Sequence, residues 1–376
     1  APNAPRDGAG NTPIDRRSTT IHNAGAKMLS ALGLMDRLTG KMAPIDQIKV
    51  AIGDARPYHS DWLLNWSSQP LTMAYVVENH QLDNALDEAI AEAPHPITLV
   101  DDSITAYHDA ADSATLELAS GAVMTSDLVI ACDGVKSPLR ALAGITPKIE
   151  ETGQRALIAT LDAEIGHDDT AYQRFLATGP IALMPLAGKQ VSLVWSTGEA
   201  QAQALMAQDD DALSEAITNA FGDELGKLTL AGPRGAFPLR PHFNRRLSKG
   251  RLILAGDAAH AIHPLAGMGY NLALADAAIL LAILQDTKAK GLCANHPSVM
   301  AAYQRRRMPE ILALSALTSQ LNRLLSRPKT PLSSLINMGA AMGMSMIDKT
   351  PLKKQLCDVA MGGKLSSAPL LKGHID

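Results

Sequence analysis

The stretch GDAAHAIHPLAGMGYN, from Gly256 to Asn271, decides the fold class that we expect for this chain. The residues before it, Arg251 to Ala255, are mostly apolar and predict a buried strand. The apolar residues after it, to about Leu284, predict a helix. A strand, a glycine-containing loop and a helix in this order indicate an α/β unit with a cofactor-binding turn.

The side chains of this loop suit a ligand that carries hydroxyls or negative charge. Gly267 and Gly269 let backbone N–H groups approach a ligand closely, and the N-terminus of the following helix favours negative charge. The Asp257 carboxylate can accept hydrogen bonds from sugar-like hydroxyls, while Pro264 stiffens the loop without adding a donor. Many ligands would satisfy these conditions, so spacing alone does not identify one.

The residues before the loop also have an α/β pattern. Apolar spacing predicts a helix from Ser18 to Leu32 that Gly33 stops, and a second from Gln81 to Ala91 with Asn79 as its cap. Three short apolar or alternating segments predict strands, at 97–100, 114–119 and 127–131. The last strand leads into the polar turn Asp133-Gly134.

The pattern changes at about Gln154. Longer strands are expected at 156–163, 181–186 and 191–196, the last two joined by a turn at Gly188-Lys189, which indicates an antiparallel sheet in a second lobe. Asp209 to Asp211 precede an apolar helical pattern. We interpret them as the negatively charged start of a helix rather than a metal site.

These patterns suggest how the chain is divided. An α/β domain is formed by residues 1–150 and 246–325, the sheet lobe is inserted as residues 151–245, and a helical tail occupies residues 326–376. The tail is rich in methionine, which suits a lipid-facing or partner-binding surface and suits core packing equally well.

Composition excludes several classes of protein. The chain is 46% hydrophobic and 19% charged with a formal charge of −4, which argues for a globular protein and against disorder or nucleic-acid binding. Three cysteines, far apart and without a CxxC pair, argue against disulfides and zinc and favour a reducing compartment. Two stretches without charged residues, 258–275 and 330–347, are interrupted by glycine, asparagine and other polar residues, so we expect no transmembrane span.

Several other residues invite a functional interpretation that we set against a structural one. His260 and His263 have no carboxylate or cysteine partner at metal-binding spacing, so we expect them to be loop or substrate-side residues. Cys132 is interpreted as a small core residue. The run Arg305 to Arg307 is interpreted as the solvated face of a long helix rather than a lipid-binding patch.

The loop residues themselves resemble a known motif. Gly256 to His260, Pro264, Gly267-Met268-Gly269, Asn271 and Asp276 resemble the second FAD motif of the class A flavoprotein monooxygenases, a family of FAD-dependent aromatic hydroxylases. The resemblance implies that Asp257 binds the ribityl chain and that Pro264 lies beside the isoalloxazine. It also implies that the backbone from Gly267 to Asn271 contacts the pyrimidine edge.

Two further elements support the resemblance. Asp133-Gly134-Val135-Lys136-Ser137-Pro138-Leu139-Arg140 resembles the family's DGxxSxxR element, which is associated with both FAD and NADPH. Asp15-Arg16-Arg17 resembles its DxR element, in which an arginine approaches the flavin, a role that we assign to Arg17. An ordinary Asp-Gly turn would also explain Asp133 and Gly134 if they stood alone.

Within the family, the chain is most similar to the hydroxylases of ubiquinone biosynthesis, and the nearest type is the group that acts on 2-octaprenyl-6-methoxyphenol. The similarity covers nearly the whole chain and includes five segments: 76–79, 174–175, 179–180, 182–186 and 192–195. It implies a Rossmann-like FAD domain with an inserted antiparallel-sheet substrate lobe and a helical tail.

The resemblance also implies a reaction. FAD reduced by NADPH would react with O₂ to give a flavin hydroperoxide, which would hydroxylate the ring of a polyprenylated phenol. No side-chain nucleophile is required, and the catalytic acid or base remains unassigned. Other ubiquinone-biosynthesis proteins are the expected partners. The expected location is the cytoplasm, with peripheral contact at the inner membrane.

The sequence departs from the family pattern near its start. No GxGxxG motif, which would hold the FAD pyrophosphate, is present, and Gly8 and Gly10 do not replace it. A strand-helix-strand unit needs roughly 30 residues, so we expect an N-terminally incomplete chain whose first βαβ unit is missing. The departure leaves two alternatives open. One is a non-catalytic flavoprotein-like scaffold that binds an isoprenoid precursor or partner enzymes, and the other is a different flavin-dependent oxidoreductase, a reductase or halogenase.

Overall fold

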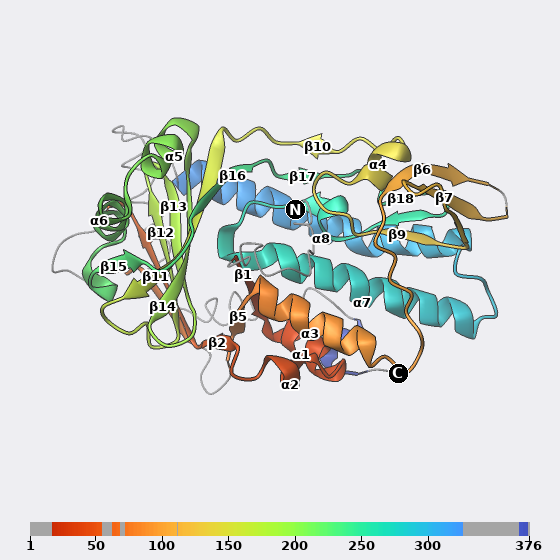
Figure 1. Cartoon of the computed structure of the whole chain (residues 1–376), viewed down its shortest axis with the longest axis horizontal. Coiled ribbons are helices and arrows are strands. Elements are labelled where there is room, and N and C mark those ends of the chain that lie inside the picture. Colours follow the sequence, from red (N-terminus) through yellow and green to blue (C-terminus); the bar gives the residue numbers. More distant parts are fainter. Residues whose placement is uncertain (1–16, 55–61, 68–71, 111, 326–367, 375–376) are drawn as a thin grey trace.

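The structure is a computed structural model that describes residues 17–54, 62–67, 72–110, 112–325 and 368–374. Its two parts are visible in Figure 1: a sheet lobe on the left, and an α/β part on the right crossed by two long helices. The long helices are α7 (Met268–Ala289) and α8 (Pro297–Leu325), which pack against each other. The methionine-rich part of the tail lies outside the described residues.

The first part of the chain forms a small antiparallel sheet in the order β1-β5-β2; α1 and α3 pack against this sheet, and α2 packs against both helices. Its elements are β1 (Ser18–His22), α1 (Asn23–Ala31), α2 (Leu34–Leu38), β2 (Met42–Ile45), β5 (Ala74–Glu78) and α3 (Asn79–Ala91). The expectation of one helix from Ser18 to Leu32 was wrong in its first turn, because the β-branched run of β1 pairs with β5 instead. The stop at Gly33 is confirmed by its left-handed backbone, φ 70°.

The second helix is confirmed, but its cap and one neighbouring strand are not. Asn79 is the first residue of α3 and accepts a hydrogen bond from Thr19 Oγ1 (2.7 Å), while Glu78 holds the cap position without a side-chain bond. The segment 97–100 is not a strand, and Leu99 is 66% exposed. No strand of the described chain pairs with it, so its apolar side chains gain nothing from an extended conformation.

Two strands that are distant in sequence form a parallel pair, β9 (Val129–Ala131) and β19 (Leu252–Leu254), with β18 (Ser248–Lys249) beside β19. A second small sheet has the order β10-β17-β20, and a three-stranded meander precedes β9. These elements are β6 (Ile104–Asp109), β7 (Ala114–Leu118), β8 (Val123–Ser126), β10 (Lys148–Ile149), β17 (His242–Phe243) and β20 (His260–Ala261). Three strands expected from the sequence, at 114–119, 127–131 and 251–255, are confirmed.

The sheet lobe is built on one large sheet, in the order β15-β11-β14-β13-β12-β3-β4 with β16 on β11. Its strands are β3 (Gln47–Ile52), β4 (Leu64–Ser67), β11 (Gln154–Ala163), β12 (Thr170–Leu176), β13 (Gly179–Pro185), β14 (Gln190–Gly198), β15 (Leu228–Leu230) and β16 (Gly235–Leu239). The antiparallel pairing of the strands after Gln154 is confirmed, but β3 joins β12 in parallel and brings an early segment into the lobe. The domain boundaries stay a prediction.

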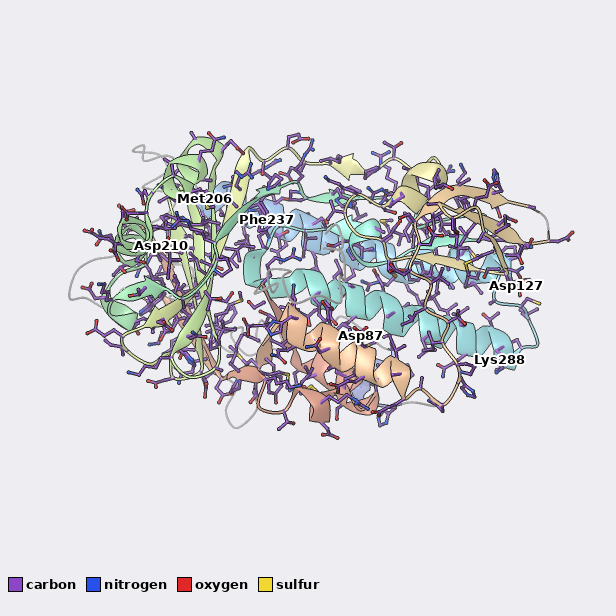
Figure 2. All side chains as sticks on the ribbon, viewed as in Figure 1. Asp87, Asp127, Met206, Asp210, Phe237 and Lys288 are labelled. Atoms are coloured by element: carbon purple, nitrogen blue, oxygen red, sulfur yellow. The ribbon has the colours of Figure 1, made fainter. Side chains whose placement is uncertain are left out.

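Alternation gives the lobe sheet two different faces. Leu157, Leu193 and Trp195 lie on one face in an apolar core with α5 (Glu199–Met206) and α6 (Asp210–Phe221). The expected helix start is confirmed, because Asp209 accepts a hydrogen bond from the Ala212 N–H (2.8 Å). Figure 2 shows Asp210 on the outer side of the lobe and Phe237, from β16, on the side nearer to α7 and α8.

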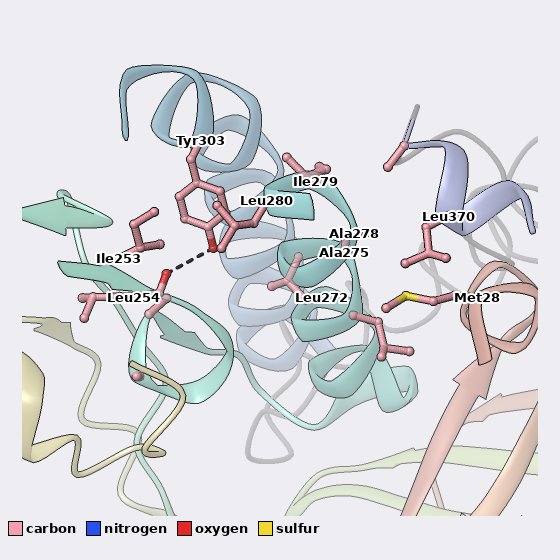
Figure 3. Close-up of a cluster of buried hydrophobic side chains, with 14 of the residues drawn as sticks. Met28, Ile253, Leu254, Leu272, Ala275, Ala278, Ile279, Leu280, Tyr303 and Leu370 are labelled. Carbon is pink, nitrogen blue, oxygen red and sulfur yellow. Dashed lines mark hydrogen bonds between the residues drawn. The ribbon is translucent and has the colours of Figure 1, made fainter. Parts of the chain in front are cut away.

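The core of the α/β part surrounds α7. Leu272, Ala275 and Ile279 of α7 are buried against side chains of β19, α1 and α8, and the hydroxyl of Tyr303 donates to the Leu254 carbonyl oxygen (3.1 Å; Figure 3). By length and composition α7 could cross a membrane, yet 44% of that apolar window is buried inside the protein. In this structure α7 is a core helix, and it positions the loop that precedes it.

Candidate functional site

The parallel pairing of β9 and β19 brings two of the expected motifs to one edge. The Ala255 N–H donates to the Ala131 carbonyl oxygen (3.0 Å), so both strands end at the same level. Asp133 and Gly134 follow one strand, and Gly256 and Asp257 follow the other. The carboxyl ends of parallel strands are where α/β folds place ligands. Elements more than 100 residues apart in sequence therefore form one site.

The α4 helix (Pro138–Leu142) joins the two motifs. The Asp133 Oδ2 accepts from the Leu139 N–H (3.0 Å) and the Ser137 Oγ accepts from the Arg140 N–H (3.0 Å), which satisfies donors at the start of α4. The buried Arg140 guanidinium donates to the carbonyl oxygens of Ala258 (2.8 Å) and Val135 (2.7 Å). Burial lowers the pKa of Arg140. This arginine fixes the second motif against the first.

A buried ionic network lies beneath the loop. The Asp276 carboxylate on α7 accepts from the Gly256 N–H (2.8 Å), from His260 Nε2 (2.7 Å) and from Arg307 Nε (2.6 Å). Arg307 also donates to the Leu272 carbonyl oxygen (3.0 Å) and to Glu310. Burial alone would raise the pKa of Asp276, but the hydrogen bond and charge of His260 and the charge of Arg307 hold it below its usual value.

The network decides one expectation and corrects another. Of the two roles expected for His260, loop or substrate-side residue, the structure supports the first, because His260 is 2% exposed and bonded to Asp276. Arg305 and Arg306 are exposed as expected, but Arg307 is completely buried. The sequence offered one signal for this: Asp276 is a charged residue within an apolar helical run, where a buried charge needs a partner.

The end of the loop is held against β1. The Asn271 side chain accepts from the His22 N–H (2.8 Å) and donates to the Thr20 carbonyl oxygen (2.7 Å) and to the Gly267 carbonyl oxygen (3.1 Å). Gly267 has φ 60°, and a Cβ there would come within 2.7 Å of Thr20 Cβ. Glycine is therefore required at Gly267, both by its backbone conformation and by its close approach to β1.

The start of α7 has the properties of a cofactor cradle. Gly267 holds the cap position and has no side chain with which to bond the first-turn N–H groups of α7. A Cβ on Gly269 would meet no heavy atom within 4 Å, which shows open space beside that turn. The exposed Asp257 carboxylate and the partly buried Pro264 lie on the same loop, and Met268 begins the helix. This arrangement fits the pyrimidine edge and ribityl hydroxyls of a flavin.

A cavity on the buried side of the loop is not the flavin site. It has a volume of about 40 Å³ and lies among α1, α7, α8 and the 3-10 turn η4 (Pro369–Lys372). That volume suits one or two water molecules, because a site for a drug-sized ligand needs roughly 300 Å³ or more. The space beside Gly269 is open and Asp257 is exposed, so both remain accessible to a ligand.

The inner face of the lobe sheet, which is the face opposite its apolar core, packs against β1. The Ser18 hydroxyl donates to the Ser192 hydroxyl (2.7 Å), and the Thr20 hydroxyl donates to Met184 Sδ (3.2 Å). Arg17, at the start of β1, has its guanidinium 5.8 Å from the Phe237 ring centre on β16. Arg17 therefore lies where β1 meets the lobe, whereas Gly267 and Asn271 contact the other end of β1.

Three polar side chains, Gln154 of the lobe, His263 of the loop and Asn322 of α8, meet at one point. The Asn322 amide donates to Gln154 Oε1 (2.8 Å), and His263 Nε2 lies 3.4 Å from the same oxygen. Burial lowers the pKa of His263 to about 4, so its ring is neutral at physiological pH. Within the described residues, His263 Nδ1 and the Thr160 hydroxyl on the inner face have no partner. Buried, unpaired polar atoms such as these are candidates for contact with a ligand or a water molecule.

One further expectation can be checked. Cys132 is exposed rather than in the core, because it follows the last residue of β9 and its neighbour Ile130 also faces outward. No group of histidine, cysteine and acidic residues that could hold a metal occurs in the part of the chain that the structure describes.

Comparison with known proteins places the chain among flavoproteins. The family model for the FAD binding domain matches residues 7–314. Ubiquinone hydroxylase UbiL of Rhodospirillum rubrum is 32% identical over 363 residues, covering 96% of this chain and 83% of that protein. The 3-demethoxyubiquinol 3-hydroxylase of Escherichia coli is 34% identical over 360 residues, covering 93% of this chain and 88% of that protein.

A solved structure gives the same fold. HpxO of Klebsiella pneumoniae, complexed with FAD and uric acid, superimposes with a TM-score of 0.71 and 18% identity, covering 95% of this chain and 90% of that one. The α/β architecture with its sheet lobe is therefore that of FAD-containing proteins.

Proposed function

The chain belongs to the FAD binding domain family and is an FAD-dependent aromatic hydroxylase, and we propose that its substrate is a polyprenylated phenol of ubiquinone biosynthesis. We further propose NADPH as the electron donor and O₂ as the source of the added oxygen. One observation carries the proposal: the similarity to the two ubiquinone hydroxylases spans nearly the whole chain and so includes both the loop and the lobe.

We propose the following roles for the loop. Asp257 would accept hydrogen bonds from ribityl hydroxyls, and the open first turn of α7, from Gly267 to Asn271, would receive the pyrimidine edge. Pro264 would lie beside the ring system. Bound FAD supplies the redox chemistry that activates oxygen, which no side chain of the protein can provide. The network of Asp276, His260 and Arg307 would hold the loop in one conformation.

We propose that the Asp133-Gly134 motif contributes to nucleotide binding and that the lobe covers the substrate. Asp133 and Gly134 end β9 beside the loop and would contact FAD or NADPH. The inner face of the lobe would cover the phenol and exclude water, with Arg17 at the junction. The sequence contains no GxGxxG, and the strand-helix-strand unit that would hold the pyrophosphate stays a prediction.

A labelling experiment tests the proposed reaction. The purified protein is incubated with NADPH, ¹⁸O₂ and a prenylated phenol, and the product is analysed by mass spectrometry. We expect the phenol to gain one labelled oxygen atom, and reactions without NADPH to give none. Oxidation of NADPH without labelled product would indicate a reductase, and incorporation of halide would indicate a halogenase; either result would contradict the proposal.

A further inference from the structure

A second pocket lies outside the loop site. It has a volume of about 430 Å³ and is formed by the segment after α4 and the segment after β17. This volume is within the roughly 300–1,000 Å³ of typical small-molecule sites. Four of the described residues that line it are cationic and none is acidic; the four are Lys148, Arg245, Arg246 and Lys249. A hollow with this charge is suited to an anion.

The four charges are available to a ligand. Among the described residues, no carboxylate forms an ion pair with any of them. Lys249 Nζ donates one hydrogen bond to the Ala143 carbonyl oxygen (2.6 Å), and Lys148 Nζ lies 5.8 Å from the Phe243 ring centre. Arg245 and Arg246 are exposed. The planar fork of each guanidinium matches the oxygens of a phosphate group.

Hydrogen bonds fix both walls of the pocket to the loop. On one side, the Ile145 N–H donates to the Arg140 carbonyl oxygen (3.0 Å), and the Arg140 guanidinium donates to the Ala258 carbonyl oxygen (2.8 Å). On the other, the Asn244 amide donates to the same Ala258 oxygen (3.0 Å). Gln304 of α8 bonds to the Arg245 carbonyl oxygen (2.9 Å). The cations therefore stand on backbone that is already ordered, which lowers the entropic cost of binding.

We propose that this pocket binds a phosphate-bearing anion, with Arg245 and Arg246 as the main donors. Two sources share this chemistry: the phosphates of a nicotinamide dinucleotide, and the headgroup of an anionic phospholipid. The nucleotide source rests on the proposed function, because it makes the pocket a subsite for the electron donor. Phosphate recognition itself does not depend on that function.

Binding of inorganic pyrophosphate, measured by isothermal titration calorimetry, tests the proposal. The wild-type protein binds pyrophosphate saturably, and the double substitution Arg245→Gln/Arg246→Gln weakens binding about tenfold or more. The matched control, Arg305→Gln/Arg306→Gln, removes the same charge from exposed positions of α8 that do not line the pocket, and changes the affinity less than about twofold. Lys148→Gln is a milder second variant in case the double variant does not fold.

Competition identifies the source of the phosphate. Displacement of pyrophosphate by NADPH indicates the nucleotide, and displacement by phosphatidylglycerol vesicles indicates the lipid headgroup. The proposal is overturned if pyrophosphate does not bind saturably or if both double variants weaken it equally. It is also overturned if neither competitor displaces pyrophosphate, which would mean an adventitious ion only. These binding readings need no turnover, so a failure of the hydroxylation experiment remains a separate result.

Discussion

Two buried arginines, Arg307 beneath the loop from Gly256 to Asn271 and Arg174 in the sheet lobe, have different structural roles. Arg307 on α8 is ion-paired with Asp276 and Glu310. Asp276 also accepts a hydrogen bond from the Gly256 N–H and so fixes the backbone of the loop. Arg174 on β12 donates to the Phe221 carbonyl oxygen (2.9 Å) and stacks on Trp62 at 5.0 Å. The N–H and carbonyl groups of an irregular loop need side-chain partners, here Asp276 and Asn271 among others, whereas a regular sheet pairs its own.

The largest expected effect is that of Arg307→Met. This substitution removes one partner of a buried ion pair and should lower the free energy of unfolding by about 3–5 kcal/mol and reduce the bound FAD. Denaturant unfolding and flavin absorbance measure the two quantities. Arg306→Met is the matched control, because Arg306 is the exposed neighbour, and its effect should stay within about 0.5 kcal/mol. Equal effects of the two substitutions would contradict the role of Arg307.

The pH dependence of stability should also arise on the loop side. The pKa of His263 is about 4 in the folded protein against 6.5 unfolded, so the unfolded chain binds more protons between these pH values. The unfolding free energy should therefore fall by roughly 3 kcal/mol as the pH decreases from 6.5 to 4. His263→Asn should remove this part of the slope. An unchanged slope in the variant would assign the pH dependence to other groups.

The arginine of the lobe should not affect the cofactor. Arg174→Met loses the hydrogen bond to the Phe221 carbonyl oxygen and the stacking on Trp62 but keeps an apolar stem, and the loss of these two contacts should cost about 2 kcal/mol. Bound FAD should not change, because both contacts lie within the sheet lobe. Loss of flavin from this variant would break the distinction between the two regions.

The smallest expected loss of stability is that of Asp209→Ala, on the outer side of the lobe. Asp209→Ala removes the side-chain cap of α6 and should cost about 1 kcal/mol of stability. The exposed Asp211, which makes no such cap, is the control position for the same change. Flavin content should stay equal in both variants. A larger loss for Asp211→Ala would show that charge, rather than the cap, stabilises this helix.

Much of the fold could be predicted from local patterns. The alternation in β11, β13 and β14 and the apolar run of α7 are patterns within consecutive residues, so they can be recognised without knowing the partner elements. The predicted strand at 97–100 failed because a strand depends on a partner that local sequence does not specify. For the same reason the pairing of β3 with β12 was not foreseen.

The motifs pointed to the candidate site residues, whose role stays a prediction, but they did not reveal the contacts that support the loop. Asp257 and Asn271 stand in a recognisable motif, yet the motif does not show that Asn271 bonds to β1. The partnership of Asp276 with Arg307 spans 31 residues and two helices, and only packing brings the two together. Buried charge pairs are therefore the part of a site that a single sequence reveals least.

The flavin content of Asp257→Ala tests the central claim most directly. Asp127→Ala is its control, because Asp127 is an exposed aspartate before β9, near the right-hand edge of Figure 2 and away from the loop. We predict that Asp257→Ala loses most of its bound FAD, as measured by absorbance in the visible flavin bands, while its circular dichroism spectrum stays unchanged. Asp127→Ala should keep its FAD. Full flavin content in Asp257→Ala would show that the loop from Gly256 to Asn271 does not hold the cofactor in the way described.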